Sequence, residues 1–177
     1  IPYFSLSEEI GDNVIVMGSP SKTFNLAGLQ ISNIFIPNEK LRKAFQTEID
    51  KTGYDEPNAL GIVACEAAYR AGEDWLDQLR AYLLKNLNFL RNFLQEKIPQ
   101  IHLVEPEGTY LVWLDCRELG MSNEELSRFM VEKAGLGLSD GYTFGRSLSG
   151  YMRLNAACPR SVLKQALEQL RAAVEAL

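Results

Sequence analysis

The chain has 177 residues, of which 46% are hydrophobic and 23% charged, a composition typical of a folded globular protein rather than a disordered one. Its 18 basic and 23 acidic residues give a formal net charge of −5, which argues against nucleic acid or an anionic membrane as a general partner. No apolar stretch is long enough to span a bilayer. The length suits one domain, or a small domain and part of another.

The cysteines argue against a metal centre or a disulfide framework. There are three, Cys65, Cys116 and Cys158, and no two of them form a Cys-x-x-Cys pair. The single histidine, His102, lies in an apolar run and is expected to be a strand residue. We therefore expect no metal site, and we interpret the cysteines as buried thiols in a reducing cytosol, which predicts a cytoplasmic protein.

The first half of the chain predicts a connector, two strands and three helices. Residues 1–12 are interpreted as the connector, and the apolar runs at 13–17 and 31–36 as buried strands on either side of a Ser/Pro loop that contains one lysine. Asn38 is a candidate N-cap for the helix that follows. Helices are then expected at 59–71 and 73–97, because apolar residues recur there at three- and four-residue steps. The leucines of the second helix indicate core packing.

The second half changes pattern at Ile98-Pro99. Strands are expected at 101–104, 109–114, 136–138 and 150–156. Ser122 with Glu125 forms a capping-box signature for a helix over 123–134, and Pro159 suits the first turn of a last helix. The order predicts an α/β protein with helices layered on sheet, in two subregions joined by a long helix.

Lys22 is the first candidate functional residue. It follows Ser19-Pro20-Ser21 in the loop between the first two expected strands. A lysine amine in a fixed position can form a Schiff base with a carbonyl group, and neighbouring hydroxyls can hydrogen-bond a phosphate. The alternative is an ordinary solvated lysine in a Ser/Pro loop.

Arg153 is the second candidate, because it lies in the middle of the otherwise apolar strand at 150–156. A half-buried guanidinium needs a partner to offset its desolvation. That partner is either an internal Asp or Glu, or the carboxylate of a substrate, which the planar fork of arginine binds through two parallel hydrogen bonds.

The segment Ser19-Pro-Ser-Lys-Thr-Phe-Asn-Leu-Ala-Gly-Leu29 resembles the cofactor-lysine segment of fold-type I pyridoxal-phosphate enzymes. Within the class I/II aminotransferase family it is most similar to the MalY/PatB group of carbon–sulfur β-lyases. The resemblance covers essentially the whole chain, as the C-terminal portion of a longer protein. It implies the aspartate aminotransferase-like fold: residues 1–50 as the end of the large cofactor domain, 51–97 as linking helices, and 98–177 as the small α/β domain.

The resemblance also assigns roles to individual residues. It implies that Lys22 is the Schiff-base lysine, that Ser19 and Ser21 bind the cofactor phosphate with it, and that Arg153 binds the substrate α-carboxylate. Gly108-Thr-Tyr110 resembles the family's substrate-facing strand, so Tyr110 is expected at the substrate. The chain departs from the pattern at Gln30, where aminotransferases often carry a phosphate-binding arginine. A phosphate site without that arginine has less positive charge.

Two further segments are similar to family loops. Asp140-Gly-Tyr-Thr-Phe-Gly145 resembles a loop near the substrate arginine, and Glu56-Pro-Asn58 resembles one that approaches the phosphate of a neighbouring subunit. The resemblance therefore implies a homodimer.

The activity implied by the resemblance is cleavage of cystathionine, cysteine or other S-substituted cysteines to pyruvate, ammonia and a thiol, with pyridoxal 5′-phosphate as cofactor. An aminotransferase that uses the same lysine is the alternative enzyme. In the family, the contacts to the cofactor ring precede the lysine segment, so the 177 residues alone are expected to be inactive. A different class of function is then a binding or structural module without activity.

Overall fold

A computed structural model describes residue 10, residues 12–54 and residues 56–177. The predicted connector at 1–12 lies mostly outside these residues. Contacts divide the chain into two compact units, one ending at Gln78 and the other beginning at Leu79. The division falls inside the helix α4 (Glu73–Lys97). The domain boundaries expected from the sequence stay a prediction.

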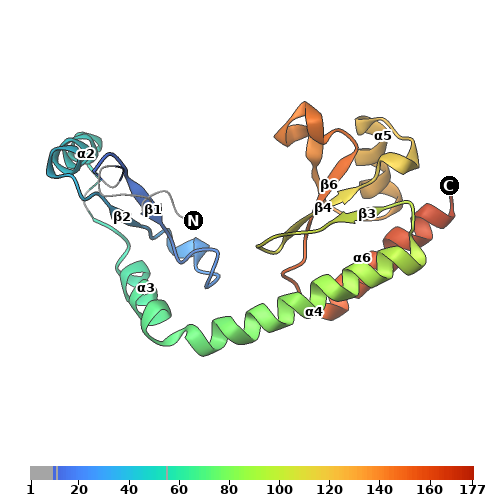
Figure 1. Ribbon diagram of the computed structural model, residues 1–177, viewed down its shortest axis with the longest axis horizontal. Helices are drawn as coiled ribbons and strands as arrows, with labels where there is room; N and C mark the ends of the chain where they lie inside the picture. The colour runs from blue at the N-terminus through green and yellow to red at the C-terminus, as the bar shows by residue number, and fades with distance from the viewer. Residues whose placement is uncertain (1–9, 11, 55) are drawn as a thin grey trace. The chain divides into compact units, whose positions relative to one another are not determined.

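The first unit contains a two-stranded antiparallel sheet and two helices (Figure 1). The elements are β1 (Val16–Gly18), β2 (Asn33–Phe35), α2 (Glu39–Thr52) and α3 (Ala59–Ala71). Both strands are shorter than expected, and the expectation that they are buried is wrong for this chain. Met17 is 64% exposed and Phe35 58%. Within the described residues β1 pairs with β2 alone, and a sheet of two strands has too little surface to be covered on both faces.

Local sequence signals account for the ends of the helices in this unit. The side chain of Asn38 accepts the N–H of Leu41 at 3.1 Å and caps α2, which ends at Gly53 with a φ of 70°. Asn58 caps α3 in the same way, accepting the N–H of Leu60 at 3.0 Å. The predicted helices at 59–71 and 73–97 are confirmed with the same bounds.

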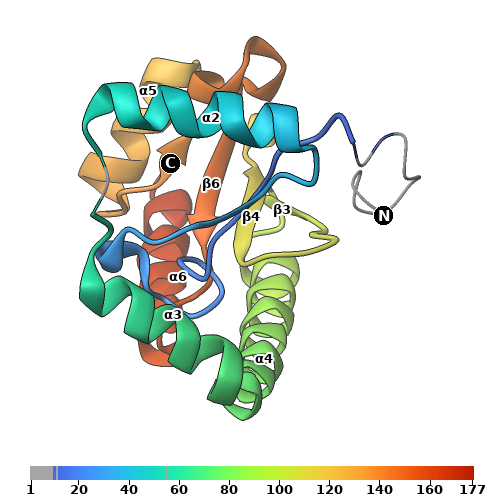
Figure 2. The same ribbon diagram turned by 90° about the vertical axis from the view of Figure 1, so that its left-hand side faces the viewer.

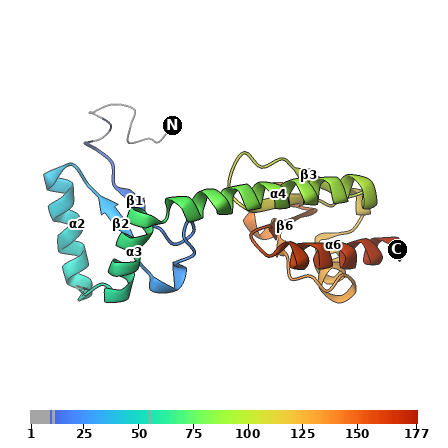
Figure 3. The ribbon, with the colours of Figure 1, turned by 90° about the horizontal axis from the view of Figure 1, so that it is seen from below.

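The second unit is built on a four-stranded antiparallel sheet in the order β3-β4-β6-β5. Its strands are β3 (His102–Val104), β4 (Leu111–Asp115), β5 (Ser139–Asp140) and β6 (Tyr151–Asn155). The helices α5 (Asn123–Arg128) and α6 (Arg160–Glu175) complete the unit with the second part of α4. In Figure 3, α6 runs beside this part of α4 along the sheet. The expected strand position of His102 is confirmed.

The core lies between one face of this sheet and the helices. Alternate residues of β4 and β6 point into it, and α4, α5 and α6 supply the rest. The most deeply buried large side chains include Val112, Leu114, Met152, Leu90, Leu94, Leu126, Leu163, Leu167 and Leu170. Leu177 lies beyond the end of α6 at Glu175 and is 70% exposed.

The region between α5 and β6 differs from the sequence prediction. The capping box of Ser122 and Glu125 is confirmed, and the helix continues as a π-helical turn over Phe129–Lys133. The strand expected at 136–138 is wrong, because the N–H of Leu136 bonds to the carbonyl of Met130 at 2.7 Å and closes the helix end. The strand β5 begins only at Ser139, opposite Arg153.

Asn86, a residue that sequence reasoning missed, joins α4 to the segment between β6 and α6. Its side chain is fully buried. The amide nitrogen donates to the carbonyls of Ala156 and Cys158, both at 2.9 Å, and the amide oxygen accepts from Nε of Arg160 at 2.8 Å. All of these partners lie just after β6 in the chain. The side chain of Asn86 therefore fixes the end of β6, the strand that carries Arg153.

No helix within the described residues is long and apolar enough to cross a membrane.

We expect Asn86→Ala to lower the free energy of unfolding by about 2–4 kcal/mol, because it leaves two carbonyls and a guanidinium nitrogen without this partner. Urea unfolding followed by circular dichroism measures the change. The control is Asn92→Ala, the same substitution at an exposed position of α4. Equal stability of the two variants would show that the buried amide has no such role.

Candidate functional site

Lys22 lies in a turn that follows β1 and that we call the lysine turn, residues 19–26. At its start, the hydroxyl of Ser19 donates to the carbonyl of Ile31 at 2.6 Å, and the hydroxyls of Ser19 and Ser21 are 2.6 Å apart. Because a hydroxyl has one proton, Ser21 is the donor in the second contact. Ser19 therefore ties the turn to the segment before β2, and both hydroxyls lie beside Lys22 in the chain.

The backbone of the lysine turn is closed by its own hydrogen bonds. The N–H of Phe24 bonds to the carbonyl of Pro20 and the N–H of Leu26 to that of Ser21, each at 2.9 Å. The side chain of Lys22 is exposed. Within the part of the chain that the structure describes, no carboxylate forms an ion pair with it. The amine is thus available to a ligand while the backbone that carries it is fixed.

Phe24 anchors the lysine turn to the junction of α3 and α4. Its ring lies edge-on to Tyr69, with centroids 5.9 Å apart, and 6.1 Å from the ring of Trp75. A Cβ added at Gly72 would lie 2.6 Å from Cε1 of Phe24, which is closer than real Cβ contacts. Figure 2 shows the turn beside α3. The lack of a side chain at Gly72 therefore allows the turn to dock there.

Arg153 lies on the outer face of the second unit's sheet, opposite the core, with Trp113 and Ser139 as its cross-strand neighbours. Its guanidinium carbon is 4.4 Å from the centroid of the Phe144 ring, and Nη2 donates to the hydroxyl of Ser139 at 3.3 Å. Among the described residues, no carboxylate forms an ion pair with Arg153. The internal acidic partner considered from the sequence is therefore not found there.

A second arginine on the outer face is paired. Arg117 binds Asp115 through two hydrogen bonds, at 2.9 and 2.7 Å, and lies over the ring of Tyr151. The hydrogen bonds from Arg117 hold the pKa of the Asp115 carboxyl below its ordinary value. Arg117 already has a carboxylate partner, whereas Arg153 has none among the described residues. The guanidinium of Arg153 can therefore bind an external anion.

Tyr110 precedes β4 rather than lying in it. Thr109 adopts a φ of 67°, so the backbone bends there and the strand begins at Leu111. The side chain of Tyr110 is half-buried, and its carbonyl accepts the N–H of Ala156.

The predicted site residues thus fall into two groups. Ser19, Ser21 and Lys22 share one turn of the first unit, and Arg153 and Tyr110 belong to the second unit. Phe24 and Gly72, which hold the turn, were not predicted as site residues. A glycine directly between two helices, with aromatic residues on both sides of it in sequence, is the signal that could have indicated this contact.

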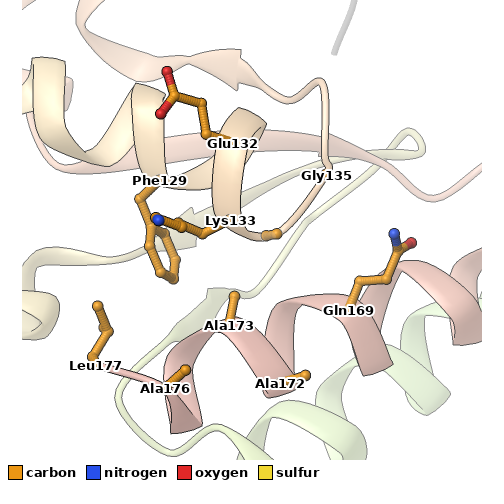
Figure 4. A pocket seen from close by; sticks show the side chains of 10 residues that line it. Phe129, Glu132, Lys133, Gly135, Gln169, Ala172, Ala173, Ala176 and Leu177 are labelled. Atoms are coloured by element: carbon orange, nitrogen blue, oxygen red, sulfur yellow. The ribbon is translucent and has the colours of Figure 1, made fainter.

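A separate hollow of about 540 Å³ lies between the π-helical turn and the end of α6 (Figure 4). Apolar Phe129, Ala173 and Leu177 line it together with the polar side chains of Lys133 and Gln169. None of the predicted site residues lines it.

Comparison with known proteins identifies the class to which this fold and these residues belong. The model of the family "Aminotransferase class I and II" matches residues 3–170. The chain belongs to this family, which confirms the family predicted from the lysine segment.

Individual relatives are similar over nearly all of the chain. The cystathionine β-lyase PatB of Bacillus subtilis is 39% identical over 173 residues, which are 98% of this chain and 45% of PatB. A pyridoxal-phosphate-bound putative aminotransferase from Clostridium difficile superposes with a TM-score of 0.95 at 41% identity, covering 98% of this chain and 45% of that one. Cystalysin from Treponema denticola, which contains a pyridoxal 5′-phosphate cofactor, has a TM-score of 0.94 at 37% identity, covering 98% and 44%.

These superpositions confirm the predicted fold class. The chain spans less than half the length of the relatives that it matches, a share consistent with the predicted C-terminal portion of the aminotransferase fold.

We expect Gly72→Ala to destabilise the first unit by about 1–3 kcal/mol, because the added methyl group overlaps the Phe24 ring and the carbonyl of Ala68. Urea unfolding followed by tryptophan fluorescence, which includes Trp75, measures the effect. Gly28→Ala is the matched control, since a Cβ at Gly28 meets nothing within 4 Å. An unchanged midpoint in Gly72→Ala would contradict the anchoring of the turn by Phe24.

Proposed function

We propose that the complete protein is a pyridoxal-phosphate-dependent carbon–sulfur β-lyase that cleaves S-substituted cysteines such as cystathionine. The observation that carries the proposal is the lysine turn, which places an exposed amine directly after two hydroxyls that are 2.6 Å apart. The names of PatB, a cystathionine β-lyase, and of two similar pyridoxal-phosphate-bound structures support the reaction and the cofactor.

The residues of the lysine turn fit the cofactor by their chemistry. A phosphate needs hydrogen-bond donors, and the hydroxyl of Ser21 becomes one when its proton turns away from Ser19. Ser19 first has to give up its bond to the Ile31 carbonyl, so we assign the stronger phosphate contact to Ser21. Gln30 adds no charge at this end, and the exposed Lys22 amine can reach a carbonyl carbon without breaking an ion pair.

Pyridoxal phosphate, when bound, would supply a sink for the electron pair left at Cα. Arg153 would bind the α-carboxylate and so fix which bond at Cα faces the base. Lys22 would remove the Cα proton and hold it. The Cβ–S bond then breaks and the sulfur leaves as a thiolate, which takes a proton to give the thiol. Water completes the conversion of the remaining three carbons to pyruvate and ammonia.

An aminotransferase is the second candidate, favoured by the family itself and by the description of the similar Clostridium difficile structure. In that reaction Lys22 would also remove the Cα proton, and it would deliver it elsewhere in the site while the Cβ substituent stays in place. Release of pyruvate from an S-substituted cysteine in the absence of any keto acid distinguishes the lyase from the aminotransferase. The homodimer and the cytoplasmic location expected from the sequence stay predictions.

We expect Lys22 to carry the cofactor in the complete enzyme. Borohydride reduction followed by peptide mapping should place the pyridoxyl label on Lys22, and Lys22→Arg should abolish both the label and pyruvate release. Lys85→Arg, the same change at an exposed position of α4, is the control that keeps both. A label on another lysine would disprove the assignment.

We expect Arg153→Lys to lower kcat/KM about ten- to a hundredfold, because an ammonium cannot form the two parallel bonds of a guanidinium and a charged hydrogen bond contributes about 1.5–3 kcal/mol. Cofactor absorbance should stay unchanged. Arg146→Lys, at an exposed position of the neighbouring 3-10 helix, should leave kinetics intact. A purely structural role predicts the opposite for Arg153→Lys: a lower melting temperature with normal kcat/KM.

A further inference from the structure

The guanidinium of Arg153 is held by an aromatic ring rather than by an acid. Its central carbon lies 4.4 Å from the centroid of Phe144, and its Nη2 donates to the hydroxyl of Ser139 at 3.3 Å. A ring whose face lies under the guanidinium carbon at this distance attracts the cation. The N–H donors of a guanidinium lie in its own plane, and a carboxylate binds along the edge of that plane.

Phe144 is itself fixed from two directions. Its ring meets Trp113 edge to face, with centroids 5.4 Å apart and planes at 81°. Phe144 is the last residue of the 3-10 helix Gly141–Phe144. The side chain of Asp140 caps the start of this helix by accepting the N–H of Tyr142 at 3.1 Å. The chain approaches β6 closely at Gly141, where a Cβ would lie 2.6 Å from the carbonyl of Tyr151.

We propose that Phe144, backed by Trp113, is the positioning residue that holds the Arg153 guanidinium edge-on to the substrate carboxylate. The proposal rests on the carboxylate role of Arg153 given above. An arginine side chain loses much rotational freedom when it binds, and a ring that restricts it in the free enzyme reduces that loss at the moment of binding. Phe144 thus acts on affinity for carboxylate-bearing ligands, through Arg153, and not on the cofactor.

The test measures binding to the complete holoenzyme with two probes. L-Alanine has no leaving group at Cβ, and ethylamine is the same molecule without the carboxylate. The ratio of their dissociation constants, measured by titrating the cofactor absorbance, reports the carboxylate contact alone. We expect Phe144→Leu to reduce the preference for alanine about 3- to 30-fold, the range typical of cation–π contacts, with little change for ethylamine.

Conservative substitution and a matched control separate positioning from general damage. Phe144→Tyr keeps the π face and should keep the preference for alanine, whereas Phe144→Met, of similar volume without a ring, should lose it as Phe144→Leu does. If Phe144→Leu does not fold, the Tyr and Met variants carry the test. Tyr142→Leu removes a ring of similar exposure from the same 3-10 helix, 47% against 50%, and should leave the ratio unchanged.

Two outcomes are decisive and distinguishable. If Arg153→Lys lowers the preference for alanine while Phe144→Leu and Phe144→Met keep it, Arg153 binds the carboxylate and the positioning role of Phe144 is overturned. If Arg153→Lys itself leaves the preference unchanged, the carboxylate role fails, and the positioning proposal fails with it. A smaller effect of Phe144→Leu in the Arg153→Lys background than in the wild type is expected, because the two residues act through one contact.

Discussion

The antiparallel pairing of β4 with β6 is the constraint on which the second unit depends. Its register places Trp113 opposite Arg153 and Val112 opposite Leu154. Because side chains alternate across a strand, the same register that buries Val112 and Leu154 in the core turns Trp113 and Arg153 to the outer face. A slip by one residue would bury a guanidinium and expose leucines at once. The burial of Val112 and Leu154 in the core therefore also determines that the proposed substrate-binding arginine points to the outer face.

The lysine turn depends on a different kind of support. In the first unit, Ile36 and Cys65 are the buried hydrophobic side chains found among the described residues, and the large core cluster begins only at Leu90. The position of Lys22 is instead set by hydrogen bonds within the turn and by the contact of Phe24 with Gly72. The hydrogen bonds within the turn are local, so the turn keeps its shape without a deep core beneath it. The docking site at the α3–α4 junction adds the long-range contact that fixes the turn's orientation within its unit.

The sequence predicted helices better than strands, for physical reasons that particular residues show. The helix ends are set by local signals, because each capping residue interacts with neighbours a few positions away in the chain. Helices begin after Asn38 and Ser122, and one ends at Gly53. The strand bounds depended on backbone conformations that the residue types do not indicate: the positive φ at Thr109, and the bond from Leu136 to Met130 in place of a predicted strand. Arg153 was found because it is a charged residue in an apolar strand, and Lys22 because hydroxyls flank it in a segment that resembles a known family. Asn86 was missed because a lone asparagine in a helical pattern carries no sign of its distant partner. The Phe24–Gly72 contact was missed because the glycine and its neighbouring aromatic residues do not by themselves name Phe24 as the partner.

The two groups of proposed site residues are expected to differ in how strongly a single substitution affects function. In the proposed site, the guanidinium of Arg153 binds the carboxylate and is supported by Phe144, Ser139 and the strand register, so its function should weaken in steps as single supports are changed. The role proposed for Lys22 is covalent, and no conservative replacement has a comparable amine. Under the proposed function, substitutions around Arg153 are therefore expected to alter affinity, while substitutions at Lys22 are expected to remove the reaction. The preference for ligands that bear a carboxylate over those that lack one would then depend on the outer face of the second unit's sheet, and the covalent step on the lysine turn of the first unit.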